Sequence, residues 1–235
     1  MILYEDDDIL VAVKPSGTVS EHTTAGDGFP DILERLLEKQ GKRRTVYTVH
    51  RLDAPTSGVM VFALNKSAAA RLSADFASAC ADSARSDSAW SDSDHAEKEY
   101  LCALCGIPNE SCGTLFDLLF YDKRAGKSYV VDRPRKGVRE AVLEYRLLDS
   151  ADTDEMTVTL VATTLKTGRT HQIRAQFASR RLPLYGDRRY GGRGQGVLGL
   201  FCRKLTFFHP SGGEKLTFEA SPPDSLPWTL FGGGH

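Results

Sequence analysis

The chain has 235 residues, of which 41% are hydrophobic and 26% are charged, and its formal net charge is -1. This length and composition predict one large domain or two small ones and exclude a mainly disordered protein. No apolar run reaches the roughly 18 residues needed to span a bilayer, and the first ten residues carry acidic side chains instead of a basic, apolar leader. We therefore expect a cytoplasmic protein without a membrane anchor. The odd number of cysteines, five in a chain of this size, does not suggest a disulfide framework.

Basic residues gather in two segments, which the near-neutral total conceals. Seven lie within residues 123–139 against one acid, Asp132, and ten lie within residues 166–204 against one acid, Asp187. If both segments fold onto one face, that surface suits the phosphate backbone of a nucleic acid. The alternative is that they are ordinary solvated loops and helix faces, and charge alone does not separate the two interpretations.

Short apolar or alternating runs predict strands along most of the chain. They cover residues 9–13, 46–50, 59–64, 100–105, 141–147, 156–162, 205–208 and 216–218. Alternation in residues 141–147 and 156–162 predicts half-buried strands with one wet face. The last two strands are separated only by residues 209–214, a connection short enough for nothing but an antiparallel hairpin.

Three segments have the spacing of helices. Asp31 is expected to cap a helix over Ile32 to Glu38, with Glu34 in the capping-box position. A second helix is expected over residues 67–79, where the apolar residues at intervals of four are Ala68, Leu72 and Phe76.

The third helix is expected to begin after Thr170 as its cap and to run to about Arg181, with Ile173 and Phe177 facing the core. Many strands, few helices and no regular alternation of the two predict an α+β fold, not a doubly wound parallel sheet.

Residues 80–98 have a composition unlike the rest of the chain. They consist mainly of Ala, Ser and Asp, which predicts an acidic loop or surface insertion, with a regulatory segment as the alternative. The glycine-rich tail after residue 231 is expected to be a frayed end.

The densest group of polar residues is His50-Arg-Leu-Asp-Ala-Pro-Thr-Ser-Gly58, between two apolar strands. So many polar groups need partners or a rim position, because burying them unpaired is costly. Arg51 and the hydroxyls of Thr56 and Ser57 would hold Asp53 ionised, and an ionised, fixed carboxylate can act as a covalent catalyst. The structural alternative is that Asp53 merely caps the turn.

A second polar group, Lys166-Thr-Gly-Arg-Thr-His-Gln-Ile-Arg174, joins a glycine turn to the start of the third helix. Free backbone N–H groups there, beside Arg169 and Arg174, predict an anion-binding site. Arg174 could pair with a carboxylate or grip a phosphate. A plain surface helix with exposed arginines is the alternative.

Other apparent signals do not support a site. The sequence around Gly126-Lys-Ser128 lacks the first glycine of a phosphate loop, where Tyr121 stands. Cys102 and Cys105 would point to opposite faces of a strand, and Cys112 has no partner at zinc-binding spacing. His50, His171 and His209 are interpreted as structural histidines.

Several motifs, taken in order, resemble the RluA-type RNA pseudouridine synthases. The first strand and turn, Ile9 to Gly17, are similar to the start of that family, and the resemblance extends to about residue 222. The motifs that carry it are His50-Arg-Leu-Asp53 with Thr56-Ser-Gly58, Lys98-x-Tyr100, Gly168-Arg-Thr-His-Gln-Ile-Arg174, Gly186-Asp187 with Tyr190, and His209-Pro210.

The resemblance implies the pseudouridine synthase catalytic fold, a mixed, mostly antiparallel bent sheet with flanking helices and loops. It implies isomerisation of uridine in RNA without metal or cofactor. By position in the motifs, Asp53 would be the catalytic nucleophile, Tyr100 would stack on the target base, Arg174 would pair with Asp53, and Arg51 would help to turn the uridine out.

The same resemblance implies RNA contacts from Arg169, Thr170, His171 and Ile173, and a partner that is a structured tRNA or rRNA stem-loop. The expected organisation is a single catalytic domain over residues 1–235, without an N-terminal RNA-binding module and with the acidic insertion pointing away from the RNA. A monomer is expected. The alternatives are an RNA-binding or RNA-folding protein with little catalysis and, third, an aspartate-dependent hydrolase acting on small substrates.

Overall fold

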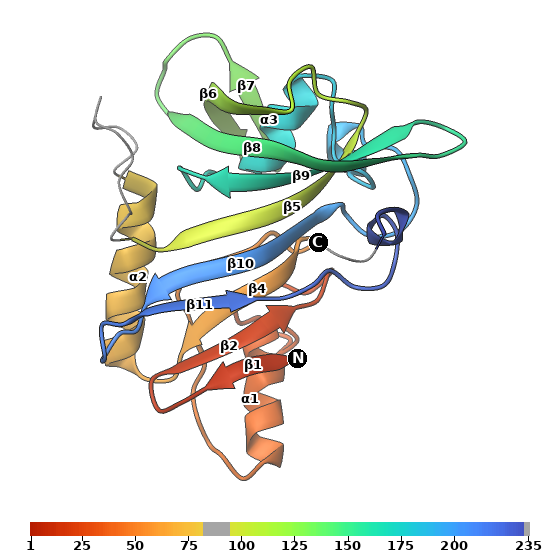
Figure 1. Cartoon of the computed structure of the whole chain (residues 1–235). Coiled ribbons are helices and arrows are strands. Elements are labelled where there is room, and N and C mark those ends of the chain that lie inside the picture. The colour runs from red at the N-terminus through yellow and green to blue at the C-terminus, as the bar shows by residue number, and fades with distance from the viewer. Residues whose placement is uncertain (82–94, 233–235) are drawn as a thin grey trace. The chain divides into compact units, whose positions relative to one another are not determined.

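A computed structural model describes residues 1–81 and 95–232 of the chain. In these residues, strands dominate and three α-helices accompany them, which confirms the predicted α+β class (Figure 1). None of these helices is long and apolar enough to cross a membrane. The described residues divide into two compact units, the first made of 1–79, 95–98 and 202–220 and the second chiefly of 99–201 and 221–232.

Antiparallel pairing builds most of the sheet of the first unit. Strands follow the order β1-β2-β4-β10, with β3 beside β4 and β11 beside β10. The predicted hairpin is confirmed, because β10 and β11 pair antiparallel with Leu205 opposite Phe218. The strands are β1 (Ile2–Glu5), β2 (Ile9–Lys14), β3 (Tyr47–Thr48), β4 (Ser57–Ala63), β10 (Leu200–Phe208) and β11 (Lys215–Glu219).

Helices α1 (Phe29–Lys39) and α2 (Lys66–Ala81) cover opposite faces of β4 (Figure 1). Val59 and Val61 face a core completed by Leu72 and other buried residues of α2. On the other face, the ring of Phe62 meets Phe29 of α1 at 5.6 Å. Both sides of the strand are therefore buried, which explains why β4 is apolar after Ser57.

The start of α1 differs from the sequence-based expectation. The helix begins at Phe29 with Gly28 as its N-cap, and Asp31 lies inside the first turn, where its carboxylate accepts the Gly28 N–H at 3.0 Å. Pro30 at the helix start explains the earlier boundary, since its fixed φ suits the first turn. Glu34 makes no capping box and instead accepts the Val46 N–H at 2.8 Å.

The second unit has the strand order β5-β9-β8-β6-β7, in which every neighbouring pair is antiparallel. Helix α3 packs on this sheet through Ala175, which joins Leu119 and Ala141 in one buried cluster. Short 3₁₀ turns lie at Arg188–Tyr190 and Trp228–Leu230. The other elements are β5 (Glu97–Cys105), β6 (Cys112–Asp122), β7 (Lys127–Val131), β8 (Val138–Asp152), β9 (Thr157–Leu165) and α3 (Gln172–Ser179).

Strand β9 corrects one expectation about exposure. The sequence alternation predicts a wet face through Thr157 and Thr159, yet Thr159 is fully buried, as is Val158. The strand is a central one, between β5 and β8, and consecutive residues along it are buried, so both of its faces are covered. Strands β1, β6 and β7 were not predicted, and β8 is more than twice as long as predicted, with a register shift between Leu147 and Asp149.

The acidic insertion and the glycine tail fall largely on residues 82–94 and 233–235, which lie outside the described part of the chain. The expectations for these two segments therefore stay predictions.

Candidate functional site

Asp53 lies in a tight turn between β3 and β4. Its backbone carbonyl accepts the Thr56 N–H at 2.9 Å, and its side chain is half-buried. The expected neighbours act differently from the prediction. Arg51 is exposed and donates from Nη1 to Glu21 Oε2 at 3.1 Å, and the buried hydroxyl of Thr56 has no hydrogen-bond partner within the described residues.

The positive charge beside this turn is Lys14, at the end of β2. Its side chain is fully buried, and its Nζ donates to the carbonyls of Pro15 at 2.9 Å, Thr18 at 2.7 Å and Ala54 at 3.0 Å. Burial lowers the pKa of Lys14 to about 8, while the charge of Asp53 acts in the opposite direction. The ammonium is therefore still mostly protonated at neutral pH and stabilises an ionised Asp53.

The chain after β2 braces the Asp53 turn on both sides. Ser20 Oγ donates to the Leu52 carbonyl at 2.6 Å and accepts the Leu52 N–H at 3.0 Å. The Gly17 N–H donates to the Ala54 carbonyl at 2.8 Å. Because the residues before and after Asp53 are both fixed, the carboxylate is held by rigid backbone, which a catalytic group requires.

His50 is a structural residue, as the sequence suggested. Its Nε2 accepts the Val61 N–H at 3.1 Å, and its ring stacks on Phe76 at 4.4 Å. Complete burial, with a smaller contribution from Lys98, holds the pKa of His50 well below its usual value. The imidazole is therefore neutral and unsuited to carry a proton at neutral pH.

Arg174 extends from the first turn of α3 to a buried carboxylate. Its Nε and Nη2 donate to the two oxygens of Asp187 at 2.7 Å and 2.8 Å, and its guanidinium lies 5.1 Å over the ring of Tyr190. Asp187 is itself 2% exposed. Such a bidentate pair fixes the plane of the guanidinium, so of the two roles considered for Arg174 the structure shows carboxylate pairing, with Asp187 as one partner.

At the start of α3, the side-chain hydrogen bonds to the preceding turn come from a glutamine and not from the expected threonine cap. Gln172 Oε1 accepts the Arg169 N–H at 2.9 Å and the Thr167 hydroxyl at 2.7 Å. His171 occupies the N-cap position in the left-handed conformation, with φ 54°. The helix cannot continue back to Thr170 through that conformation, and at least one N–H expected to bind an anion is already satisfied.

The two basic segments meet in the second unit. Tyr190 Oη accepts the Ser128 N–H at 2.8 Å and lies 3.0 Å from His171 Nδ1, and Lys127 Nζ lies 4.8 Å over the Tyr190 ring. Arg189 Nη1 also donates to the Gly126 carbonyl. The exposed cations on these segments include Lys123, Arg124, Arg188 and Arg189, which supports the prediction of a basic surface.

The predicted site residues fall into two groups. Arg51 and Asp53 belong to the first unit. Those of the second unit are Tyr100, Arg169, Thr170, His171, Ile173 and Arg174. Tyr100 lies opposite Thr163 in the β5–β9 ladder and is 5% exposed. Ile173 is 4% exposed, so its side chain belongs to the core, which the helical spacing also predicted.

Sequence reasoning missed the groups that support Asp53 and Arg174. Lys14 ends an apolar strand, where a lysine usually marks a wet strand end, and only the fold shows that it turns inward. Asp187 was noticed as the one acid of a basic segment and as part of a motif, but not as the partner of Arg174. The position of Lys14 at the end of an apolar run, and the presence of a single acid among the arginines around Asp187, are the signals that could have suggested these two roles.

Comparison with known proteins yields one family. The family model described as RNA pseudouridylate synthase matches residues 8–179. An uncharacterized RNA pseudouridine synthase of Aquifex aeolicus is 33% identical over 96% of this chain and 70% of that protein. The tRNA pseudouridine synthase C of Haemophilus ducreyi is 31% identical over 93% of this chain and 89% of its own length.

Further relatives include the dual-specificity RNA pseudouridine synthase RluA of Escherichia coli, which is 29% identical over 94% of this chain and 92% of its own. Among solved structures, human RNA pseudouridylate synthase domain containing 1 superposes with a TM-score of 0.73 at 22% identity. That superposition covers 94% of this chain and 83% of the human chain. At this identity the likeness concerns the fold.

Proposed function

Because the chain belongs to the RluA-type family of RNA pseudouridine synthases, we propose that it isomerises specific uridines in structured tRNA or rRNA, with Asp53 as the catalytic nucleophile. The observation that carries the role of Asp53 is the local one. A half-buried carboxylate lies in a braced turn, beside the buried ammonium of Lys14, in the position of the family's His-Arg-Leu-Asp motif.

The chemistry accounts for the need for such a carboxylate. The N1–C1′ bond of uridine breaks, the detached uracil turns, C5 bonds to C1′, and the C5 proton is then lost while N1 gains one. An ionised aspartate assists the first step as a nucleophile and is regenerated at the end, so no external reactant is consumed. Holding the uracil next to the sugar is a proximity effect.

The uridine must leave the RNA stack before this reaction, since stacking shields both C5 and the glycosidic bond. Tyr100 is assigned to stacking on the extruded base, and the exposed Arg51 is assigned to the space that the uridine vacates. Arg174 is assigned to pairing with Asp53. These three roles rest on the family motifs.

The proposed substrate class rests on the relatives and on charge. Two relatives are named for their RNA: the tRNA pseudouridine synthase C and a ribosomal large subunit pseudouridine synthase D of Xanthomonas campestris. The exposed cations of the second unit suit a phosphate backbone. No element of the chain is assigned to reading the RNA sequence. We therefore expect the protein to recognise the shape and the splayed bases of a stem-loop.

Pseudouridine mapping in total RNA from cells with and without this protein tests the proposal. We expect one or a few tRNA or rRNA uridines to lose the modification and to regain it when the wild-type chain is restored. The rival function, an RNA-binding or RNA-folding protein with little catalysis, predicts altered RNA association with an unchanged modification map. If cells that normally express the protein keep the same pseudouridine map when the protein is removed, the proposal is overturned.

A further inference from the structure

One face of the sheet formed by β6, β7 and β8 carries exposed aromatic side chains. Leu119 of β6 belongs to the same buried cluster as Ala175 of α3. Because successive residues of a strand point to opposite faces, Phe116 and Phe120 point away from the helix. Phe116 is 60% exposed, and Tyr129, which lies opposite Phe120 in the β6–β7 ladder, is 42% exposed. The face away from α3 therefore presents two aromatic rings to solvent.

The chain crosses this face between β7 and β8. Both strands flank β6 and run antiparallel to it, so residues 132–137 return across β6 before β8 begins. Cζ of Arg135 lies 4.6 Å from the centre of the Phe120 ring, which shows that the crossing is on the face away from α3. Arg133 and Lys136 of the same segment are exposed, as is Arg135. A segment with three cations therefore crosses the face that bears the two exposed rings.

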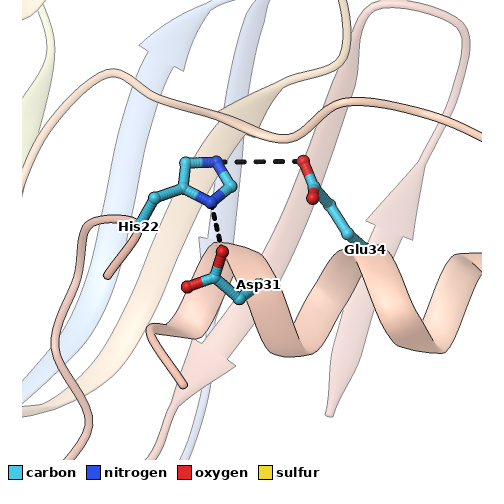
Figure 2. A group of neighbouring side chains, drawn as sticks. All are labelled: His22, Asp31 and Glu34. Carbon is cyan, nitrogen blue, oxygen red and sulfur yellow. Dashed lines mark hydrogen bonds and ion pairs between the residues drawn. The ribbon is translucent and has the colours of Figure 1, made fainter. Parts of the chain in front are cut away.

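The cluster of His22, Asp31 and Glu34 in the first unit is an example of charges that compensate each other (Figure 2). His22 Nδ1 lies 2.5 Å from Asp31 Oδ1, and His22 Nε2 lies 3.8 Å from Glu34 Oε1. The Nε2 atom also lies 2.9 Å from the Val46 carbonyl oxygen. Each charged group of this cluster has a partner inside the protein, so the cluster needs no ligand.

The cations of residues 132–137 are not compensated in this way. Within residues 1–81 and 95–232, none of Arg133, Arg135 and Lys136 forms an ion pair with a carboxylate. The segment has these three cations against one acid, Asp132, which leaves a net charge of +2. Uncompensated positive charge on an exposed segment is available for an anionic partner, such as a chain of phosphates.

Each exposed ring has a neighbour that limits its movement. Phe116 lies opposite Val142 in the β6–β8 ladder, where side chains of a pair are in contact distance. Lys127 Nζ lies 5.5 Å from the centre of the Tyr129 ring. A ring that is already held in place loses little freedom when a second flat group stacks on it.

Exposed rings beside uncompensated cations are the elements of a surface for single-stranded nucleic acid, on which bases stack and phosphates find positive charge. Bases inside a duplex are stacked on each other, so only unpaired nucleotides can use the rings. A second copy of this chain fits less well. In a symmetric dimer each copy would present the same patch, and the cations of the two copies would repel each other.

We propose that Phe116 and Tyr129 stack on unpaired nucleotides of the RNA substrate, while the cations of residues 132–137 contact the phosphates. Phe116 lies roughly 13 Å along β6 from Phe120, the neighbour of Tyr129, so the two rings take separate nucleotides. The inference rests on the proposed function, from which the RNA substrate comes. It adds two residues that bind RNA outside the reaction site, and it implies that the substrate has unpaired nucleotides besides the target uridine.

Filter binding with three RNAs tests the inference: an unmodified tRNA transcript, a short oligouridylate and a fully paired RNA duplex of the same length. Phe116→Leu and Tyr129→Leu keep an apolar side chain and remove the ring. We expect each to weaken the affinity for the transcript and the oligouridylate by about fivefold or more, and to leave the affinity for the duplex unchanged. Tyr4→Leu, at a tyrosine of the first unit that is 38% exposed, is the matched control and should change none of the three.

Two further measurements separate stacking from a general disturbance of the surface. The slope of log affinity against log salt should be the same in the ring variants and the wild type, because no phosphate contact is lost. Phe116→Trp keeps a ring, so it should bind oligouridylate at least as tightly as the wild type, and the fluorescence of the added tryptophan should be quenched on binding. Melting temperatures show whether each variant folds.

Equal affinity of the two leucine variants and the wild type for oligouridylate would overturn the inference, even if the chain forms pseudouridine. Weaker binding by both variants, without pseudouridine formation by the wild type, would support the inference and overturn the proposed function. A wild-type dimer in sedimentation that dissociates in Phe116→Leu would also overturn the inference, because the ring would then belong to an interface between two copies.

Discussion

Lys14 shows how a single residue supports the proposed catalytic carboxylate. A buried charge is costly unless hydrogen bonds replace its water, and the ammonium of Lys14 has three carbonyl acceptors. One of them belongs to Ala54, next to Asp53. The lysine therefore holds the turn and supplies its counter-charge at the same time.

The lowered pKa of Lys14 predicts a pH dependence of stability. In the unfolded chain the amine titrates near pH 10.5, and in the folded chain near pH 8, so between these values the unfolded state holds the extra proton. The free energy of unfolding contributed by this group therefore rises with pH in that window, by at most about 1.4 kcal/mol per pH unit.

Urea denaturation of the wild-type chain and Lys14→Met at pH 7.5, 8.5 and 9.5 measures this contribution. We expect the stability difference, wild type minus variant, to increase with pH, because the variant lacks the titrating group. A difference that stays constant or falls over this range would contradict the buried position of the ammonium.

The site residues illustrate what the sequence can and cannot predict at this scale. The density of polar groups around Asp53 identified the turn, and the family motifs suggested roles for Tyr100 and Arg174. The supporting residues were not predicted, since Lys14 is 39 residues from Asp53 and Asp187 is 13 residues from Arg174. Their contacts arise from tertiary folding, which local patterns do not encode.

At the scale of elements, the β6–β7 hairpin and the entrance to α3 are joined through one phenol. Tyr190 Oη accepts the Ser128 N–H of β7 and is hydrogen-bonded to the His171 imidazole before α3. The guanidinium of Arg174 lies over the ring of the same tyrosine. The tyrosine thus connects the two basic segments in the second unit. Its hydroxyl is the part of the residue that makes the connection.

Tyr190→Phe should lower the free energy of unfolding by about 1–3 kcal/mol, because the buried Ser128 N–H loses its acceptor. The ring, and with it the contact with Arg174, is retained. Urea denaturation measures the loss, and Tyr129→Phe, an exposed tyrosine of the same hairpin, is the matched control. Equal stability of the two variants would show that the Tyr190 hydroxyl does not contribute this stabilisation.

Element prediction succeeded where the pattern was local. The runs that became β2, β4 and β11 and the helix α2 were found with small boundary errors, because burial of one or both faces leaves a clear pattern. Strand β6 was missed because its apolar residues do not alternate, and β7 because its basic neighbours suggested a surface segment. The starts of α1 and α3 depend on Pro30 and on the left-handed His171, which the capping patterns did not anticipate.

At the scale of the whole molecule, the proposed function separates two tasks: Asp53 in the first unit would perform the chemistry, and the exposed cations of the second unit would hold the RNA. If so, RNA affinity should fall with salt, and each lost phosphate contact should reduce the slope of log affinity against log salt by about 0.7–0.9. The double variant Lys123→Gln/Arg124→Gln removes two exposed cations from the β6–β7 turn.

Lys39→Gln/Lys215→Gln removes the same charge from exposed positions of the first unit and is the control. Filter binding of a tRNA transcript at several salt concentrations should give a smaller slope for the first variant and an unchanged slope for the second. Equal slopes in both variants and the wild type would place the RNA elsewhere.

The catalytic role of Asp53 is tested most directly by Asp53→Asn. Turnover and RNA affinity are both measured on one unmodified transcript that contains the target uridine. Asparagine keeps the shape and loses the charge, so we predict that pseudouridine formation is abolished while affinity stays within about tenfold, or 1.4 kcal/mol. Asp27→Asn, in an exposed loop of the first unit, should change neither quantity. Pseudouridine formation by Asp53→Asn at the wild-type rate would contradict the account.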